Sequence, residues 1–240
     1  MKKFKQRAAH YLKNTSDRFN SAVYAIPVLL LYNVGLILTG NTTINGADFL
    51  TVALLAHFGY QGFLIFNLVL LAASAVLVPI MIKKKKFSFS YAWIVCIEGL
   101  AYSLLMMFSI SFIIEEAEKR FLSAGLTGGT TILEKLTISA GAGFWEEALF
   151  RAALLALLAW LFNRFVFKKK AAAGWLSYSL AIIVTSLLFS GAHYLGSEPF
   201  SIYSFSFRAI AGVMFSIIFT LRGFALAVYT HAIYDILVLI

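Results

Sequence analysis

The sequence predicts an all-α membrane protein, a polytopic bundle of about seven transmembrane helices. Of its 240 residues, 61% are apolar and only 13% are charged, whereas soluble domains carry about 25% charged residues. The apolar residues fall into long runs, several of them close to the roughly 20 residues with which a helix crosses a bilayer. Most lysine and arginine residues cluster between these runs. Together these observations exclude an ordinary soluble domain.

The chain begins with a basic segment, residues 1–20, which holds six of the lysine and arginine residues. Such a segment is expected on the cytoplasmic side, at the anionic lipid surface. Because no small-residue cleavage site follows the first apolar run, this run is expected to remain as a span rather than to be removed as a signal peptide. Residues 21–240 show no repeat and no soluble part, so we expect one transmembrane domain.

Seven spans are expected in order along the chain: residues 21–39, 62–82, 91–114, 136–162, 175–195, 202–221 and 224–240. Residues 50–60 are interrupted by His57 and Gly59, and are expected either to lie in the membrane interface or to extend the second span. Residues 115–135 form the longest polar connection, which we expect to hold a short surface helix or a loop over the site.

The distribution of positive charge orients these spans. The N-terminal segment, residues 83–86, residues 164–170 and Arg222 together hold 15 of the 20 lysine and arginine residues. All four places lie on one side if every span crosses once, and the positive-inside rule makes that side cytoplasmic. The net charge of +9 therefore indicates topology and gives no reason to expect nucleic acid as a partner.

The fourth apolar run opens with three ionisable residues, Glu146, Glu147 and Arg151. Each costs about 2.5 to 3.5 kcal/mol in hydrocarbon even on the lenient insertion scales, so the sequence needs a reason to place them there. Glu147 and Arg151 are four residues apart and share a helix face, acid before base, which favours an ion pair. Glu146 points about 100° away from Glu147. We therefore expect Glu147 and Arg151 to support the site and Glu146 to be free for chemistry.

Two later spans are also interrupted by polar residues. His193 lies near the end of the fifth span, and His231 and Asp235 share one face of the seventh. Because charged groups in lipid must pair or line a wet cavity, we expect these three side chains to converge with Glu146.

Glu98 and Arg208 are the other ionisable residues inside apolar runs. Glu98 is expected either to act in function or to hydrogen-bond between helices. Arg208 has three alternatives: it neutralises Glu198, binds a substrate carboxylate, or extends to the membrane surface, and the last is our expectation.

A carboxylate beside two histidines in a wet pocket supports two kinds of hydrolysis. In the first, Glu146 and His193 take a proton from a water molecule that attacks a carbonyl group, and His231 donates a hydrogen bond to the oxyanion. In the second, Glu146, His193 and His231 bind Zn²⁺, which acidifies the water. The sequence lacks the compact zinc motif His-Glu-x-x-His, so we expect no metal and keep zinc as the alternative.

Three motifs occur in order on successive late spans: Glu146-Glu147-x-x-x-Arg151, Phe189-x-x-x-His193 and His231-x-x-x-Asp235. In this arrangement, residues 136–240 resemble the CAAX-protease and bacteriocin-processing family (CPBP, or Abi), which includes the Rce1-type prenyl-protein proteases. The resemblance implies a glutamate-dependent endopeptidase with a conical intramembrane catalytic cavity. By position, Glu146 and His193 would activate water, and His231 with the residue at 235 would bind the oxyanion.

Asp235 departs from the asparagine of Rce1-type members. An ionised aspartate cannot donate a hydrogen bond to an oxyanion. Asp235 is therefore either protonated or orients His231 without contacting the substrate itself, and we prefer the second role.

The resemblance leaves substrate and setting open. The expected partners are membrane lipid and a peptide or protein that is lipid-modified or membrane-anchored, or a leader peptide. The alternative function is a non-enzymatic membrane immunity or partner-binding protein. Chain length and basic flanks favour the plasma (inner) membrane of a prokaryote, and the charge distribution favours a cavity that opens to the outer face.

Overall fold

The computed structural model describes residues 2–40, 43–84, 87–113, 131–167, 173–195 and 198–240. The helices in these residues are α1 (Lys2–Ser16), α2 (Arg18–Leu38), α3 (Phe49–Lys83), α4 (Phe89–Ile113), α6 (Ile132–Gly141), η1 (Ala142–Leu155), α7 (Ala156–Leu161), η2 (Phe162–Val166), α8 (Ala173–Ala192), η3 (His193–Leu195), α9 (Ile202–Arg222) and α10 (Phe224–Leu239). No strand occurs among them. The expected all-α class is confirmed. Most of the long connection expected at residues 115–135 lies outside the described residues.

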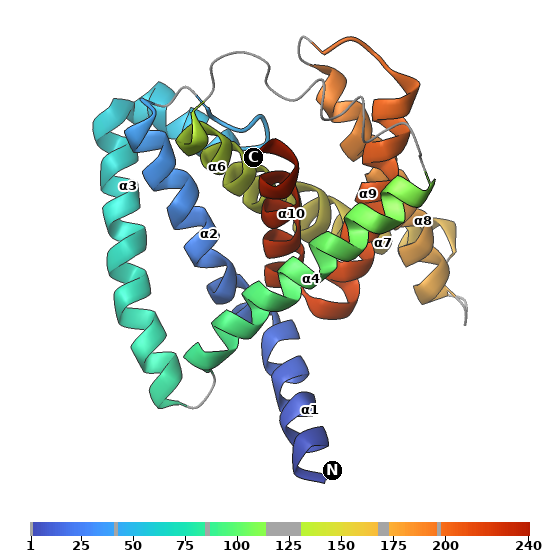
Figure 1. Ribbon diagram of the computed structural model, residues 1–240, viewed down its shortest axis with the longest axis horizontal. Coiled ribbons are helices and arrows are strands. Elements are labelled where there is room, and N and C mark those ends of the chain that lie inside the picture. Colours follow the sequence, from blue (N-terminus) through green and yellow to red (C-terminus); the bar gives the residue numbers. More distant parts are fainter. Residues whose placement is uncertain (1, 41–42, 85–86, 114–130, 168–172, 196–197) are drawn as a thin grey trace.

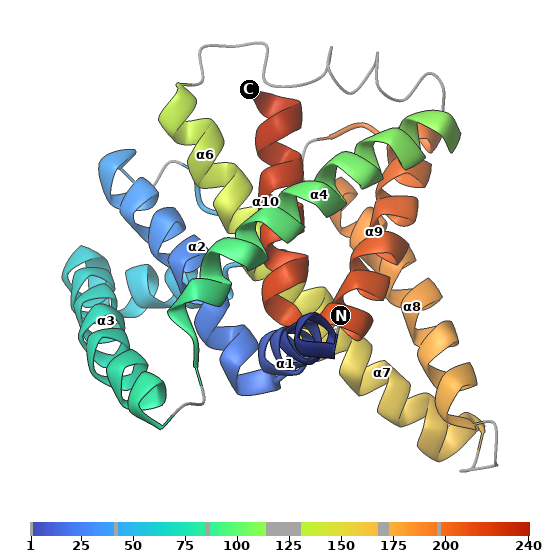
Figure 2. The ribbon, with the colours of Figure 1, turned by 60° about the horizontal axis from the view of Figure 1, so that its bottom comes forward.

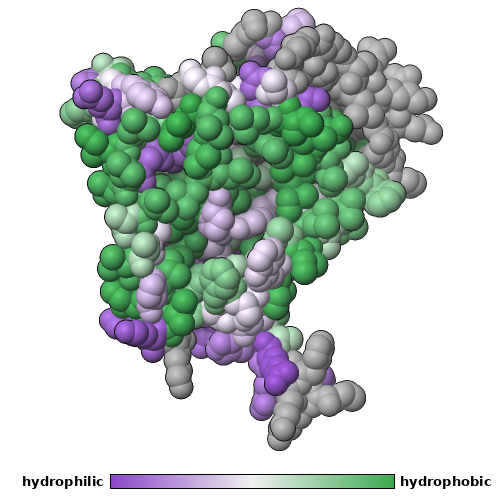
Figure 3. All heavy atoms as spheres, turned by 60° about the vertical axis from the view of Figure 1, so that its left-hand side comes forward, coloured by the Kyte–Doolittle hydropathy of each residue, from purple (hydrophilic) through white to green (hydrophobic). Residues whose placement is uncertain are grey.

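The helices form a polytopic membrane bundle. Within the described ranges, six are long and apolar enough to cross a membrane: Arg18–Leu38, Phe49–Lys83, Phe89–Ile110, Ile132–Val166, Gly174–Leu195 and Ile202–Arg222. Figure 3 shows apolar side chains over a broad band of one face, between hydrophilic groups at its two ends. Large side chains such as Trp93 and Phe108 are exposed within the apolar helices, by 69% and 76%. This surface suits lipid rather than water.

The seventh apolar helix, α10, is shorter and lies inside the bundle. Its 16 residues span only about 24 Å, less than the roughly 30 Å of a hydrocarbon core. Packing explains why a short helix is sufficient, because α10 contacts α2, α4, α6, η1 and α9. Figure 2 shows it in the middle of the other helices, with α4 crossing in front. Because other helices surround α10, polar side chains on its buried face are kept away from lipid.

The helix α3 has a break at Gly59. This residue has φ +62° and ψ −168°, a conformation that suits glycine, and it divides α3 into two helical parts. The sequence left residues 50–60 either in the interface or as an extension of the second span. The structure makes them a separate helical part that leads into the long one (Figure 1).

Residues 132–166 form one continuous helix from α6 through η2, longer than the expected span of residues 136–162. At 1.5 Å per residue, 35 residues reach about 50 Å, so this helix crosses the bundle obliquely, as Figure 2 shows. Its central part, η1, is π-helical over Ala142–Leu155 and carries Glu146, Glu147 and Arg151. Such wide turns often occur at functional sites.

Gly143 allows η1 and α10 to approach closely. A Cβ atom at this position would lie 2.7 Å from the Cβ of Ala232 and 2.8 Å from the carbonyl oxygen of Val228. Any larger side chain would therefore push the two helices apart. This contact sets the acidic residues of η1 against His231, the neighbour of Ala232.

Candidate active site

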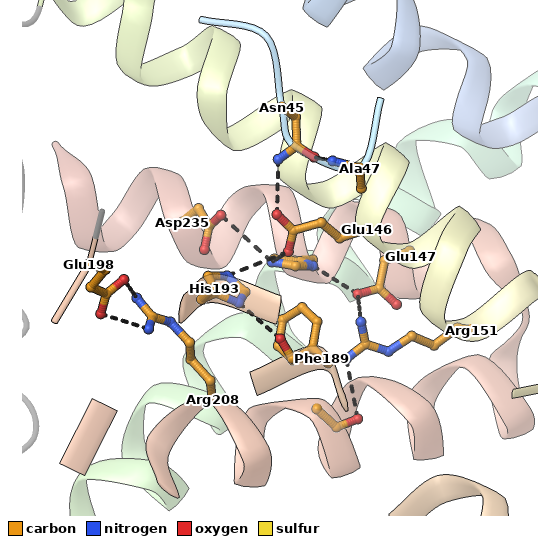
Figure 4. A network of polar contacts seen from close by, with 12 residues as sticks. Asn45, Ala47, Glu146, Glu147, Arg151, Phe189, His193, Glu198, Arg208 and Asp235 are labelled. Carbon is orange, nitrogen blue, oxygen red and sulfur yellow. Dashed lines mark hydrogen bonds and ion pairs between the residues drawn. The ribbon is translucent and has the colours of Figure 1, made fainter. Parts of the chain in front are cut away.

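The polar residues of η1, the end of α8 and α10 meet in one cluster (Figure 4). Glu146 and Glu147 come from η1, His193 from the short turn η3 that follows α8, and His231 and Asp235 from α10. The structure thus brings together all four residues that the sequence singled out for chemistry. It adds three residues whose connection with this cluster the sequence did not show: Asn45, and the ion pair of Arg208 with Glu198.

Glu147 is the centre of the buried support. Arg151 Nη1 lies 3.0 Å from Glu147 Oε1, and the two side chains are 1% and 0% exposed. The same oxygen lies 2.8 Å from His231 Nδ1. The Arg151 guanidinium also lies over the Phe189 ring, 4.3 Å from its centroid. Since both partners are withdrawn from lipid and water, this ion pair fixes η1 to α8 and α10.

Glu146 is held on one oxygen only. Asn45 Nδ2 donates a hydrogen bond to Glu146 Oε1 over 2.9 Å. Glu146 Oε2 is buried and has no hydrogen-bond partner. It lies 4.0 Å from His193 Nε2 and 3.9 Å from His231 Nε2. A carboxylate oxygen is therefore oriented toward both imidazoles at a separation that a bridging water molecule suits.

The second ring nitrogen of each histidine fixes what the first can do. His193 Nδ1 lies 2.9 Å from the Phe189 carbonyl oxygen. Because that oxygen can only accept, Nδ1 carries the hydrogen, and Nε2 of the neutral ring is an acceptor facing Glu146. His231 Nδ1 likewise donates to Glu147, so its Nε2 carries a hydrogen only in the imidazolium form.

Asp235 lies on the cavity side of His231. Its Oδ2 is 3.7 Å from His231 Nε2, and its side chain is 22% exposed. From the sequence we preferred Asp235 as the residue that orients His231 from behind. In the structure, Glu147 makes the short contact with His231 Nδ1, and Asp235 faces the nitrogen that points into the cavity.

Asn45 is the site residue that sequence reasoning missed. It lies in the connection between α2 and α3, where its backbone N–H donates to Tyr32 Oη over 3.0 Å and its Oδ1 accepts from the Ala47 N–H over 2.8 Å. The Tyr32 hydroxyl in turn donates to Asp48, the N-cap residue of α3. The Asn-Gly pair at residues 45–46 is a recognisable turn signal, but nothing in the sequence connects it with Glu146.

Burial also affects Asp48 itself. Its side chain is completely buried, and this burial raises the pKa of its carboxyl group, although hydrogen bonds from Thr51 and Tyr32 act in the opposite direction. The turn that carries Asn45 is thus supported by buried polar groups on both sides.

The cluster opens into a cavity of about 250 Å³. Its walls combine the polar cluster with apolar side chains of α6, α8, α9 and α10, among them Ile138, Phe189, Phe207, Phe215 and Val238. The lining includes the beginning of α9 and the end of α10. The cavity therefore lies toward the end of the bundle where the C-terminus is found, opposite the N-terminus (Figure 1).

Arg208 lies in the cavity wall and pairs with Glu198. Its Nη1 and Nη2 donate to Glu198 Oε1 and Oε2 over 2.8 and 2.9 Å. Burial opposes ionisation of Glu198, but the hydrogen bonds from Arg208 outweigh it and hold the pKa of this carboxyl below its usual value. Of the three alternatives that the sequence left for Arg208, the structure shows the pair with Glu198.

Glu98 lies apart from this site. Its carboxylate accepts from Arg222 Nε and Nη2 over 2.6 and 2.7 Å, and it also accepts from the Tyr11 hydroxyl. These contacts join α4, α9 and α1. Glu98 does not line the cavity. Of the two roles left open by the sequence, the structure gives it that of a hydrogen-bonding residue between helices.

Metal binding receives no support from the geometry. In the parts of the chain that the structure describes, no three histidine, cysteine, aspartate or glutamate side chains are grouped so as to hold a metal ion.

Comparison with known proteins identifies the family. Residues 128–237 match the family model described as "Type II CAAX prenyl endopeptidase Rce1-like". This part of the chain belongs to the Rce1-like family. The match covers Glu146, His193, His231 and Asp235, and leaves Asn45 outside. A search of curated proteins and a search of solved structures found no match.

The Rce1-like family consists of CAAX proteases, which are peptide hydrolases, so the expected family and class of enzyme are confirmed. Together with the apolar helices, membership shows an integral, multi-pass membrane protease of the CAAX type.

Proposed function

We propose that the protein cleaves a peptide bond near the C-terminus of a lipid-modified or membrane-anchored protein, with water as the nucleophile. The observation that carries the proposal is the unpartnered Oε2 of Glu146, which lies about equally far from His193 Nε2 and His231 Nε2. Membership of the CAAX protease family supports the substrate class.

Glu146 and His193 activate the water molecule in this proposal. A water molecule between Glu146 Oε2 and His193 Nε2 donates one hydrogen bond to each, since both atoms are acceptors. As its oxygen forms a bond to the carbonyl carbon, its proton passes to this acid–base pair. The proton then goes to the leaving amine while the C–N bond breaks. The acyl product keeps the OH group and the amine product keeps the hydrogen.

His231 stabilises the oxyanion. Three carboxylate groups surround its ring: Glu147 at Nδ1 and Glu146 and Asp235 near Nε2. In this proposal His231 acts as an imidazolium, because only in that form can Nε2 donate a hydrogen bond while Nδ1 donates to Glu147. The Phe215 ring stacks on the imidazole at 4.3 Å and 19°, which fixes the direction of that donor. A preoriented donor of this kind contributes most when charge develops on the carbonyl oxygen.

The proposed setting is the plasma membrane of a prokaryote, with the basic N-terminal residues 1–20 in the cytoplasm and residues 21–240 as one transmembrane domain. In Figure 1, α3, whose last residue is Lys83, ends toward the end of the bundle that holds the N-terminus. Arg222, the last residue of α9, contacts Thr15 of α1 at the same end. The positive-inside rule supports a cytoplasmic position for that end. The cavity then opens toward the opposite face.

Purified protein in lipid vesicles, with a prenylated peptide ending in Cys-a-a-X, tests the reaction. We expect Glu146→Gln, His193→Ala and His231→Ala each to lower the rate about 10²-fold or more, and Glu146→Gln to keep the melting temperature of the wild type. Glu134→Gln is the matched control on the same continuous helix, since glutamine also completes the capping box that Glu134 makes with Thr131.

Two results would contradict the mechanism. Full activity of Glu146→Gln would exclude Glu146 as the base. Loss of activity with chelators and recovery with Zn²⁺ would favour the zinc alternative with Glu146, His193 and His231 as ligands.

A further inference from the structure

We propose that Arg208 is a carboxylate-binding residue that receives the C-terminal carboxylate of the substrate, and that Glu198 occupies this position until the substrate arrives. The inference rests on the proposed function, because it concerns which end of a peptide enters the cavity. It gives a role to a charged pair that the hydrolytic reaction does not use.

Arg208 is built into the same cavity as the candidate catalytic residues. It lies in the first third of α9 and lines the cavity together with Glu146, His193 and Asp235. Its side chain is only 14% exposed. In Figure 4, the guanidinium lies beside His193, on the side away from Arg151. A substrate bound across His193 therefore meets this cation next.

The guanidinium already holds a carboxylate in the geometry that suits a C-terminus. Two nitrogens donate to the two oxygens of Glu198 over 2.8 and 2.9 Å. Such a two-point contact is specific for a planar carboxylate and orients it as well as attracting it. The Tyr194 ring lies 5.8 Å from the guanidinium carbon and supports its position. Arg208 is thus preorganised for a carboxylate, whichever one it holds.

Glu198 is a partner that can be replaced. It belongs to the connection between η3 and α9, and its side chain is 37% exposed, so its carboxylate reaches water when it is released. Ion pairs with an exposed partner contribute little, so the displacement of Glu198 costs little. The contrast is Arg151, whose partner Glu147 is 0% exposed and also holds His231. Of these two arginines, only Arg208 has a counter-ion that a substrate can displace.

The chemistry of the substrate supplies such a carboxylate. A Cys-a-a-X sequence stands at the extreme C-terminus of a protein, so three residues separate the cysteine from a free carboxylate. Three extended residues reach at most about 10 Å, which keeps the carboxylate close to the scissile bond. The apolar side chains Phe207, Phe215 and Val238 in the cavity wall suit the apolar residues between. Arg208 would therefore select chain ends over internal peptide segments.

The test uses two prenylated peptides that differ only at the C-terminus, one with a free acid and one with a carboxamide. For the wild type in lipid vesicles, we expect the KM of the acid peptide to be up to about tenfold lower than that of the carboxamide peptide. The two kcat values should be similar, because a contact that is equally strong in the ground state and the transition state changes KM alone. Arg208→Gln should remove this preference and leave a ratio near one. Glu198→Gln should increase the preference, because the competing carboxylate is gone. Arg208→Lys, which keeps the charge but loses the two-point contact, should retain only part of it.

The outcomes separate substrate binding from a purely structural brace between the loop and α9. A wild-type ratio of one, or an unchanged ratio in Arg208→Gln, would overturn the inference. So would parallel changes for both peptides in Arg208→Gln and Glu198→Gln, accompanied by a lower melting temperature.

A binding measurement separates this inference from the proposed reaction. The Kd of each peptide for Glu146→Gln protein is independent of cleavage. If the wild type cleaves neither peptide but Glu146→Gln binds the acid about tenfold more tightly than the amide, the proposed function fails and the carboxylate site stands. If the wild type cleaves both peptides and their Kd values are equal, the proposed function stands and the carboxylate site fails.

Discussion

Removal of the Glu147 carboxylate is expected to destabilise the fold far more than removal of the Glu146 charge. In Glu147→Ala, Arg151 keeps its positive charge but loses the counter-ion at 3.0 Å, in a position where its side chain is 1% exposed. Its remaining polar contact, from Nη2 to the Gly212 carbonyl oxygen, is long at 3.4 Å.

The size of the effect follows from this burial. Deleting one partner of a buried ion pair costs about 3 to 5 kcal/mol, because the other charge is left uncompensated. For a chain of this length, 1 kcal/mol corresponds to about 2 to 4 °C in melting temperature. We therefore expect Glu147→Ala to lower the melting temperature in detergent by roughly 6 to 20 °C. Adding Arg151→Met should recover part of this loss, since it removes the uncompensated charge.

The protein provides a matched control in the pair of Arg208 with Glu198. Glu198→Ala breaks a contact of the same chemistry, but its carboxylate is 37% exposed, and such pairs contribute about 0 to 1 kcal/mol. Thermal unfolding of Glu147→Ala, Glu198→Ala and Glu146→Gln, measured side by side, checks the reasoning. Equal shifts in all three variants would refute the division between a supporting and a catalytic carboxylate. A double variant no more stable than Glu147→Ala would refute its electrostatic cause.

Two further predictions concern the turn at Asn45 and the side of the membrane. Asn45→Asp keeps the oxygen that accepts from Ala47 but loses the amide donor to the catalytic carboxylate. Hydrogen bonds to charged groups contribute about 1.5 to 3 kcal/mol, so kcat should fall about 10- to 100-fold at an unchanged melting temperature. A variant with the kcat of the wild type would show that the hydrogen bond to Glu146 does not contribute to catalysis. Single cysteines at Leu195 and Arg164, in a Cys96→Ser background, should react with an impermeant thiol reagent on intact cells at Leu195 only. Labelling at Arg164 instead would place the cavity on the cytoplasmic side.

The family match begins at residue 128, but the candidate site does not depend on this part of the chain alone. Asn45 reaches Glu146 from the connection between α2 and α3. The first helices therefore do more than anchor the protein in the membrane. A fragment limited to the matched residues would lack the donor that orients Glu146.

Local properties of the sequence determined the class of the protein and part of its site. The apolar runs and the placement of positive charges follow from the order of residues along the chain, without any knowledge of its contacts, and these predicted the helical membrane bundle. The pairing of Glu147 with Arg151 follows from their spacing of four residues on one helix. The order of the three motifs was sufficient to indicate the family, as the match over residues 128–237 confirms.

The tertiary structure decided the contacts that join distant segments. The hydrogen bond from Asn45 to Glu146 joins residues 101 positions apart, and no periodicity links them. His231 is oriented by Glu147 rather than by Asp235, because the small Gly143 lets α10 approach η1 on that side. For Arg208 the sequence left three alternatives, and the structure shows the pair with Glu198. The partner of Glu146 and the partner of His231 each depend on which segments pack against η1, and residue spacing along the chain does not determine that packing.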